Sequence, residues 1–150
     1  MSAGASSVSV QIAPVQTASR IGLTFNRRAL LITLALLCIE VSIATVFRHI
    51  GWLRGFVGDA LAVVFVYYGF KTFFRASTLQ LASAALLVGY GVELSQYLSH
   101  LYGWKISNPV IRIVVGSTPD WWDVVAYTVG FGLVIAAQRL TERTQAPKPC

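Results

Sequence analysis

The sequence predicts an all-α membrane protein with four transmembrane helices. Hydrophobic residues make up 55% of the 150-residue chain and charged residues only 12%, whereas ordinary soluble domains contain about 25% charged residues. The mean hydropathy is +0.64. The apolar residues form four runs close to the roughly 20 residues that a helix needs to cross a bilayer. This composition argues against a water-soluble globule, and it excludes a disordered chain, which needs low hydrophobicity and high net charge.

The predicted membrane domain covers residues 28–138 and lies between two tails. Residues 1–20 are rich in Ser, Ala, Gln and Gly, and the predicted flexible tail covers residues 1–27. The first apolar run begins only after Arg28 and contains Glu40, which disfavours a cleaved signal peptide. Residues 139–150 form the second tail. The predicted spans are residues 29–47, 56–74, 79–98 and 121–137.

Only one connection between the predicted spans is long. The others are short. Lys71 lies at the end of the second span, where its long aliphatic side chain is expected to carry the ammonium group to the membrane surface. Residues 99–120 are interrupted by glycines and prolines, which predicts a loop. Within this loop, residues 110–115 are apolar apart from Arg112. We expect them to form an interfacial or re-entrant segment.

The distribution of basic residues predicts that both termini are cytoplasmic. With four spans, the termini share one side with the connection between the second and third spans, and this side holds eight of the twelve Lys and Arg residues. Basic residues accumulate on the cytoplasmic side of membrane proteins. All four tryptophans fall on the other side, where amphipathic rings suit the headgroup level.

Most of the acidic residues are predicted to lie near the outer ends of the spans. Asp59 begins the second span, Glu93 lies about one and a half turns before the end of the third, and Asp120 and Asp123 begin the fourth. An ionisable residue in a membrane helix costs about 2.5–3.5 kcal/mol and normally faces other helices. For Glu40, deeper in the first span, we expect a hydrogen bond to Ser or Thr on another helix, or a protonated acid.

Helical spacing gathers these acids on two stripes. Glu93, Gln96 and His100 recur at helical intervals on the third span, and Asp120, Asp123, Tyr127 and Gly130 do so on the fourth. Small residues allow close helix contacts in membranes, so Gly89, Gly91, Gly130 and Gly132 are expected at helix interfaces. The candidate pocket consists of Glu93, Gln96, Arg112, Asp123, Tyr127 and Asp59.

Arg112 is the predicted counter-charge of this pocket. It interrupts an apolar stretch, so it needs a carboxylate if that stretch is buried, and a bidentate pair with Glu93 or Asp123 would be the strongest arrangement. A metal site is not expected, because no metal-binding spacing such as H-E-x-x-H occurs. Scattered basic residues argue against a nucleic-acid partner. No cofactor is predicted.

The order of these residues resembles a known family. Val92-Glu93-Leu94-Ser95-Gln96 closes the third span, Arg112 follows, and Asp123-x-x-x-Tyr127-x-x-Gly130 opens the fourth. This pattern is similar to the VanZ-like group of small bacterial membrane proteins over residues 28–138. Asn often stands there in place of Tyr127, so the chain is more similar to the branch described as domain of unknown function 2809. The resemblance singles out Glu93, Gln96, Arg112 and Asp123. It implies a cell-envelope setting, with the bacterial inner membrane as the expected location.

The predicted function is to bind or modify a lipid headgroup or a lipid-linked cell-envelope precursor in an outward-facing polar pocket. Membrane lipids are the expected partners. An enzyme acting on such a lipid would use Glu93 or Asp123 as a general base, but no nucleophile stands out. Two more hypotheses stay open: a small proton-coupled carrier, and a structural or accessory subunit that binds no ligand. The sequence does not decide the oligomeric state.

Overall fold

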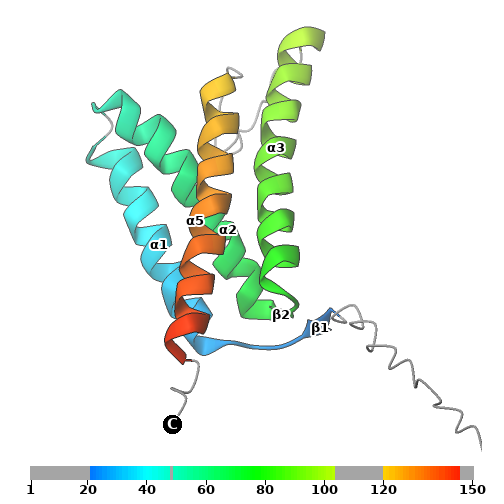
Figure 1. The fold of residues 1–150 in the computed structure, drawn as a ribbon. Coiled ribbons are helices and arrows are strands. Elements are labelled where there is room, and N and C mark those ends of the chain that lie inside the picture. The colour runs from blue at the N-terminus through cyan, green and yellow to red at the C-terminus, as the bar shows by residue number, and fades with distance from the viewer. Residues whose placement is uncertain (1–20, 48, 104–119, 146–150) are drawn as a thin grey trace, which may run out of the picture.

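The structure is a computed structural model that describes residues 21–47, 49–103 and 120–145. Four helices dominate this part of the chain (Figure 1). They are α1 (Arg27–Thr45), α2 (Gly58–Phe73), α3 (Thr78–Tyr102) and α5 (Trp121–Gln145). A π-helical turn, η1 (Leu53–Val57), leads directly into α2. The short strands β1 (Gly22–Leu23) and β2 (Phe74–Arg75) form an antiparallel pair.

Successive helices run in opposite directions. In Figure 1, α1 and α3 begin at the end of the bundle where α2 and α5 finish. Helix α2 contacts α1, α3 and α5. The backbone N–H of Asn26 donates to the carbonyl oxygen of Thr72 at 2.9 Å, and that of Thr24 to Phe73 at 2.9 Å, so the start of α1 is tied to the end of α2. Both ends of the described chain therefore lie at one end of the bundle.

Local sequence signals set the helix ends. The side chain of Asn26 accepts a hydrogen bond from the backbone of Ala29 and caps α1, which satisfies one of the first N–H groups of the helix. Ser77 and Gln80 form a capping box at the start of α3. Gly103 ends α3 with φ 66°, in the left-handed region that glycine adopts without a steric cost.

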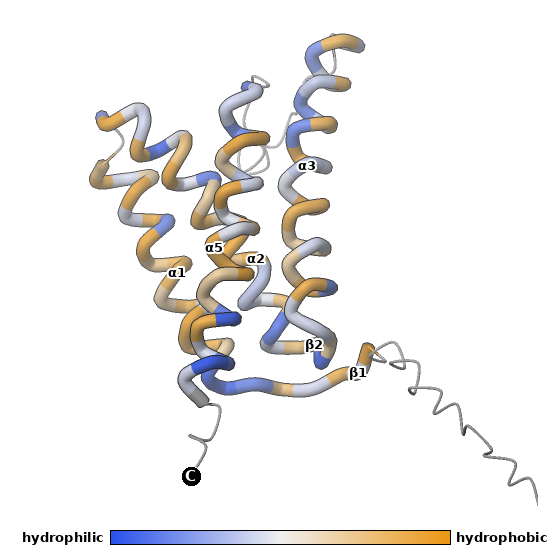
Figure 2. The backbone as a smooth tube through the Cα atoms, viewed as in Figure 1, coloured by the Kyte–Doolittle hydropathy of each residue, from blue (hydrophilic) through white to orange (hydrophobic). Residues whose placement is uncertain are grey.

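Three helical segments are long and apolar enough to cross a membrane. They are Arg27–Thr45, Leu53–Phe73 and Trp121–Thr144. Their outer faces carry exposed large apolar side chains such as Leu31 and Leu133, as expected for surfaces that contact lipid. Figure 2 shows hydrophobic residues along the helices and hydrophilic ones at the start of α1 and the end of α5. The prediction of a mainly helical fold is confirmed, with three helices that suit a membrane.

The fourth predicted span coincides with α3, which has 25 residues but is not among the three membrane-spanning candidates. Its composition explains the difference, because Gln80, Ser83, Glu93, Ser95 and Gln96 dilute its apolar residues. Whether α3 crosses the membrane and on which side the termini lie therefore remain predictions.

Two helices extend beyond the predicted spans, and one short strand lies in the predicted tail. Helix α5 continues to Gln145 rather than ending at residue 137, because hydropathy marks the end of the apolar stretch, whereas residues 138–145 contain no Gly or Pro to stop the helix. Helix α3 reaches Tyr102 for the same reason. Gly22–Leu23, placed in the flexible tail, pairs with β2.

Some predictions fall on residues that the structure does not describe. Most of the N-terminal tail, the last five residues and most of the long loop lie outside the described residues. Arg112 and the predicted interfacial segment 110–115 belong to this group. The proposed pairing of Arg112 with an acidic side chain therefore stays a prediction.

Two of the four glycines expected at helix interfaces are found there. A Cβ atom on Gly130 of α5 would collide with the carbonyl oxygen of Ala60 on α2, and one on Gly89 of α3 would lie 3.0 Å from the Tyr127 ring of α5. Gly91 and Gly132 have no such neighbour among the described atoms within 4 Å. The glycine pattern alone could not show which face of each helix is packed.

Candidate functional site: a partly buried acidic cluster

Each of the four helices contributes one carboxyl group to the same region of the bundle. Asp59 of α2 interacts electrostatically with Glu40 of α1, Glu93 of α3 and Asp123 of α5. The Asp123 side chain also lies close enough to those of Asp59 and Glu93 to interact with both directly. Glu40 reaches α2, since its Oε2 atom is 3.8 Å from the position of a Cβ on Gly58. We call these four residues the acidic cluster.

Tyr127 lies next to the acidic cluster. Its side chain is buried, with 6% of its surface exposed, and its hydroxyl donates a long hydrogen bond of 3.5 Å to Oδ1 of Asp59. The same hydroxyl interacts electrostatically with Glu93 and Asp123. Because the ring packs over Gly89, the missing side chain at that position makes the space that brings the phenol close to the acids.

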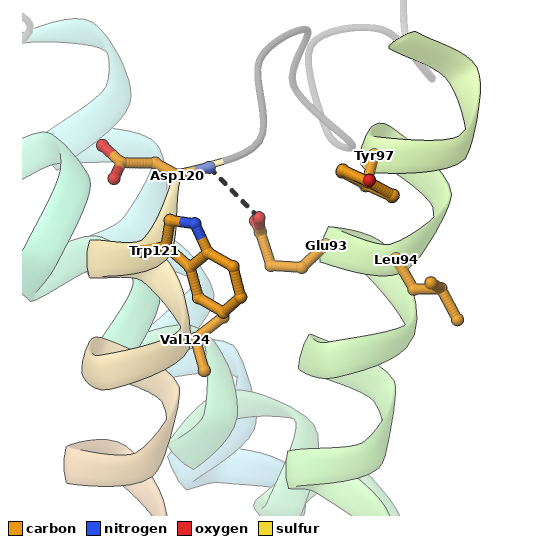
Figure 3. Close-up of a pocket in the computed structure, with 6 residues that line it drawn as sticks. All are labelled: Glu93, Leu94, Tyr97, Asp120, Trp121 and Val124. Carbon is orange, nitrogen blue, oxygen red and sulfur yellow. Dashed lines mark hydrogen bonds between the residues drawn. The ribbon is translucent and has the colours of Figure 1, made fainter. Parts of the chain in front are cut away.

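Glu93 is the most deeply buried member of the acidic cluster. It is 7% exposed, and its Oε2 atom accepts a hydrogen bond of 3.3 Å from the backbone N–H of Asp120, as Figure 3 shows. Its Oε1 atom is buried without a hydrogen-bond partner among the described residues. Leaving a buried carboxylate oxygen unsatisfied costs free energy, so this atom is ready to accept a hydrogen bond from a ligand.

Of the two alternatives expected for Glu40, a hydrogen bond to Ser or Thr on another helix or a protonated acid, the first is not formed by its Oε1 atom. Its Oε1 atom is buried and has no partner in the described part of the chain. The hydroxyls of Ser42 and Thr45 on the same helix instead donate to backbone carbonyls of α1. This is the usual choice for Ser and Thr in a helix, and it leaves Glu40 directed at the start of α2.

A pocket of about 520 Å³ lies between α3 and α5 beside Glu93. Its described lining comes from α3 and from the start of α5 with the residue before it, in two triplets with the same spacing, i, i+1 and i+4. Of the six described lining residues, two are acidic and four are largely apolar. The triplets are Glu93, Leu94, Tyr97 and Asp120, Trp121, Val124.

The structure brings most of the predicted pocket residues together. Glu93, Asp59, Asp123 and Tyr127 interact with one another, and Gln96 is buried one turn further along α3. His100, on the same predicted stripe, is exposed. Sequence reasoning did not place Glu40 in the site.

Sequence reasoning also missed the apolar pocket wall. Leu94, Tyr97, Trp121 and Val124 follow the acids at helical spacing, but apolar residues that face a pocket and those that face lipid have the same spacing. The deep position of Glu40 in the first span was the signal that could have added it to the site, since a buried acid in a membrane helix normally faces other helices.

The chemistry of the acidic cluster favours a cationic or hydrogen-donating ligand. Carboxylates held close together repel, and a proton or a cationic group between them relieves the repulsion. In the part of the chain that the structure describes, no three His, Cys, Asp or Glu side chains are arranged to hold a metal ion.

Fold and site together define a helical protein with helices suited to a membrane and a partly buried acidic cluster at one end of its bundle. The family model for the protein of unknown function DUF2809 matches residues 48–131, more than half of the chain, and the chain belongs to this family. The matched segment includes Asp59, Glu93, Asp123 and Tyr127, whereas Glu40 lies before it. No curated protein and no solved structure is significantly similar to this chain.

Proposed function

We propose that the protein binds the headgroup of an amine-bearing membrane lipid, or of an amine-bearing lipid-linked envelope precursor, in the pocket between α3 and α5. One observation carries the proposal: Glu93 is buried at the edge of this pocket, and its Oε1 atom has no hydrogen-bond partner among the described residues. A protonated amine donates up to three hydrogen bonds. It would satisfy Oε1 and reduce the repulsion within the acidic cluster.

The rest of the pocket suits the other half of an amphiphile. Trp121 and Tyr97 are 85% and 55% exposed, and such rings with one apolar and one polar part favour the headgroup level of a membrane. Leu94 and Val124 extend the wall with aliphatic surface. A headgroup held at Glu93 would place its hydrocarbon chain along these residues, in contact with the surrounding bilayer.

The lipid-retention test uses Glu93→Gln, which keeps the side-chain shape and removes the charge. A charge-assisted hydrogen bond contributes about 1.5–3 kcal/mol, so we expect at least a roughly tenfold loss of affinity. The full-length protein is purified from membranes in mild detergent, and retained phosphatidylethanolamine and phosphatidylglycerol are measured by native mass spectrometry. Wild type should retain phosphatidylethanolamine preferentially, and Glu93→Gln should lose this preference.

Two further variants make the test specific. Glu142→Gln removes an exposed carboxylate near the other end of α5 and should leave retention unchanged. Trp121→Ala removes an exposed part of the pocket wall without disturbing the core. It should weaken retention of phosphatidylethanolamine, and it keeps the test possible if Glu93→Gln does not accumulate in the membrane. Wild-type retention in both Glu93→Gln and Trp121→Ala would leave the acids a purely structural role and refute the proposal.

The proposal places the acidic cluster at the external face of a bacterial inner membrane, with four crossings and cytoplasmic termini. Basic residues at the opposite end of the bundle support this orientation. The VanZ-like relationship and the cell-envelope setting belong to the same proposal. They rest on the Glu93 and Asp123 motifs together with Arg112, which the structure does not describe.

Reporter fusions test this orientation. Fusions of alkaline phosphatase, which is active only outside the cytoplasm, are made after Arg75, Tyr102 and Cys150. We expect activity only after Tyr102, and fluorescent protein fusions at the same positions should give the inverse pattern. If the fusions after Arg75 and Tyr102 report the same compartment, α3 does not cross the membrane.

A further inference from the structure

A second pocket lies at the end of the bundle opposite the acidic cluster. It has a volume of about 250 Å³ and is formed where α1 and α3 begin and α2 ends. Polar and basic side chains dominate its lining, and no carboxylate lines it within the described residues. The residues that matter here are Asn26, Tyr67, Lys71, Arg75 and Thr78. We call it the basic pocket.

Lys71 is held in the basic pocket by neutral groups only. Its Nζ atom donates to Oε1 of Gln138 at 2.7 Å and to the hydroxyl of Tyr67 at 3.2 Å, and it lies 5.4 Å from the centre of the Tyr67 ring. An ammonium group has three N–H donors, so one remains after these two bonds. The half-buried charge forms no ion pair with a carboxylate in the described part of the chain.

Side chains from three helices surround Lys71. Tyr67 is fully buried, and its hydroxyl lies close to the side chain of Thr78 at the start of α3. Gln138 of α5 donates to the hydroxyl of Tyr68 at 3.2 Å while it accepts from Lys71. Three helices thus fix the position of one ammonium group, which reduces the entropy lost when an anion binds to it.

The electrostatics around the basic pocket favour an anion. Arg75 lines the pocket, and its side chain makes no hydrogen bond or ion pair with the described residues. The N-termini of α1 and α3, which carry partial positive charge, both border it at Asn26 and Thr78. One acid, Glu142, interacts electrostatically with Tyr67. Basic residues outnumber it at this end of the bundle: Arg27, Arg28, Lys71, Arg75, Arg139 and Arg143.

We propose that the basic pocket binds a phosphate group, with Lys71 and Arg75 as its cationic contacts and Asn26 and Thr78 as neutral ones. The phosphate comes either from the headgroup of an anionic membrane lipid or from free inorganic phosphate. This site is distinct from the headgroup site proposed above, because it lies at the other end of the bundle and has the opposite charge.

Binding is tested with the full-length protein in phosphatidylcholine nanodiscs that contain increasing amounts of phosphatidylglycerol. Bound phosphatidylglycerol is counted by native mass spectrometry. Removing one charge-assisted contact should weaken binding about tenfold, so Lys71→Met and Arg75→Gln should each show this loss. Arg75→Lys keeps the charge and should keep most of the binding. Because Arg75 is exposed, Arg75→Gln is expected to fold even if Lys71→Met does not.

Arg143→Gln is the matched control. It removes the same charge from the same end of the bundle, from an exposed position that does not line the pocket, and it should leave the count of bound phosphatidylglycerol unchanged. If Arg143→Gln weakens binding as much as Arg75→Gln, the lipid responds to general surface charge and the pocket proposal is wrong.

A second arm distinguishes the two sources of phosphate. Lipid-depleted protein in detergent is heated with inorganic phosphate or with phosphatidylglycerol, and the unfolding midpoint is recorded. A midpoint raised by inorganic phosphate in wild type but not in Arg75→Gln identifies free phosphate as a ligand. A rise with phosphatidylglycerol alone identifies the lipid phosphodiester. If neither probe stabilises the protein, the proposal is refuted.

Discussion

Replacing Gly130 by valine is expected to prevent the bundle from forming. A Cβ atom at this position would overlap the carbonyl oxygen of Ala60 and lie 3.1 Å from the Cβ of Val63. The first contact is with backbone, which cannot rotate away, so α2 and α5 would have to separate. The cost should reach or exceed the roughly 3 kcal/mol that marks the upper end of ordinary overpacking, because this separation also exposes the core cluster around Val63 and Tyr67.

The comparison variant for this prediction is Gly132→Val. Gly132 lies two residues further along α5 and is exposed, with no described atom within 4 Å of the position that a Cβ would take. Both variants are expressed in membranes, and folded protein is measured by size-exclusion chromatography in detergent and by thermal unfolding. Gly132→Val should behave like wild type, and Gly130→Val should give little folded protein. Equal yields and equal unfolding midpoints would show that α2 and α5 do not pack as described.

Much of the fold could be predicted because the relevant signals are local. The apolar runs gave three helices that suit a membrane, and Asn26 and Ser77 lie where their side chains cap the following helices. The ends of the apolar runs were poor guides to helix ends, as α5 shows. The pairing of β1 with β2 could not be predicted, because a two-residue strand has no periodicity and depends on contacts between distant segments.

The candidate site could be predicted in part for a related reason. An acid in a membrane helix is costly alone, so Glu93, Asp59 and Asp123 had to face the bundle interior. Helical spacing then put Tyr127 on the same face as Asp123. Spacing cannot show how deeply one helix sits against another, and this depth decides that Glu40 reaches Asp59.

The two ends of the bundle have opposite electrostatic character. At one end, the acidic cluster contains one carboxyl group from each helix. At the other end, Lys71 lies in the basic pocket with neutral hydrogen-bond partners. Tyr67 and Tyr127 are buried tyrosines of the same core cluster, one contacting the basic group and the other the acids. The core thus links the two sites, and its packing should affect both.

The last prediction concerns the core contact below the acidic cluster. Tyr127→Ala should lower the free energy of unfolding by about 3–5 kcal/mol, as is usual when a large buried ring is removed. Gly89→Ala alone should also destabilise the protein, since its Cβ would lie 3.0 Å from the Tyr127 ring. Accommodating such an extra group in a packed core costs about 1–3 kcal/mol. In the Tyr127→Ala background the ring is gone. There Gly89→Ala should stabilise the protein by up to about 1 kcal/mol, because alanine is the better helix former.

This reversal of sign is measured by a double-mutant cycle on unfolding in detergent, which isolates the coupling between two residues. Gly91→Ala is the matched control, since it lies on the same helix with no described atom within 4 Å of its Cβ position. It should have the same small effect in both backgrounds. If Gly89→Ala changes the free energy of unfolding in the same direction in wild type and in the Tyr127→Ala background, the ring does not pack over Gly89. The phenol would then lack the support that keeps its hydroxyl within reach of Asp59.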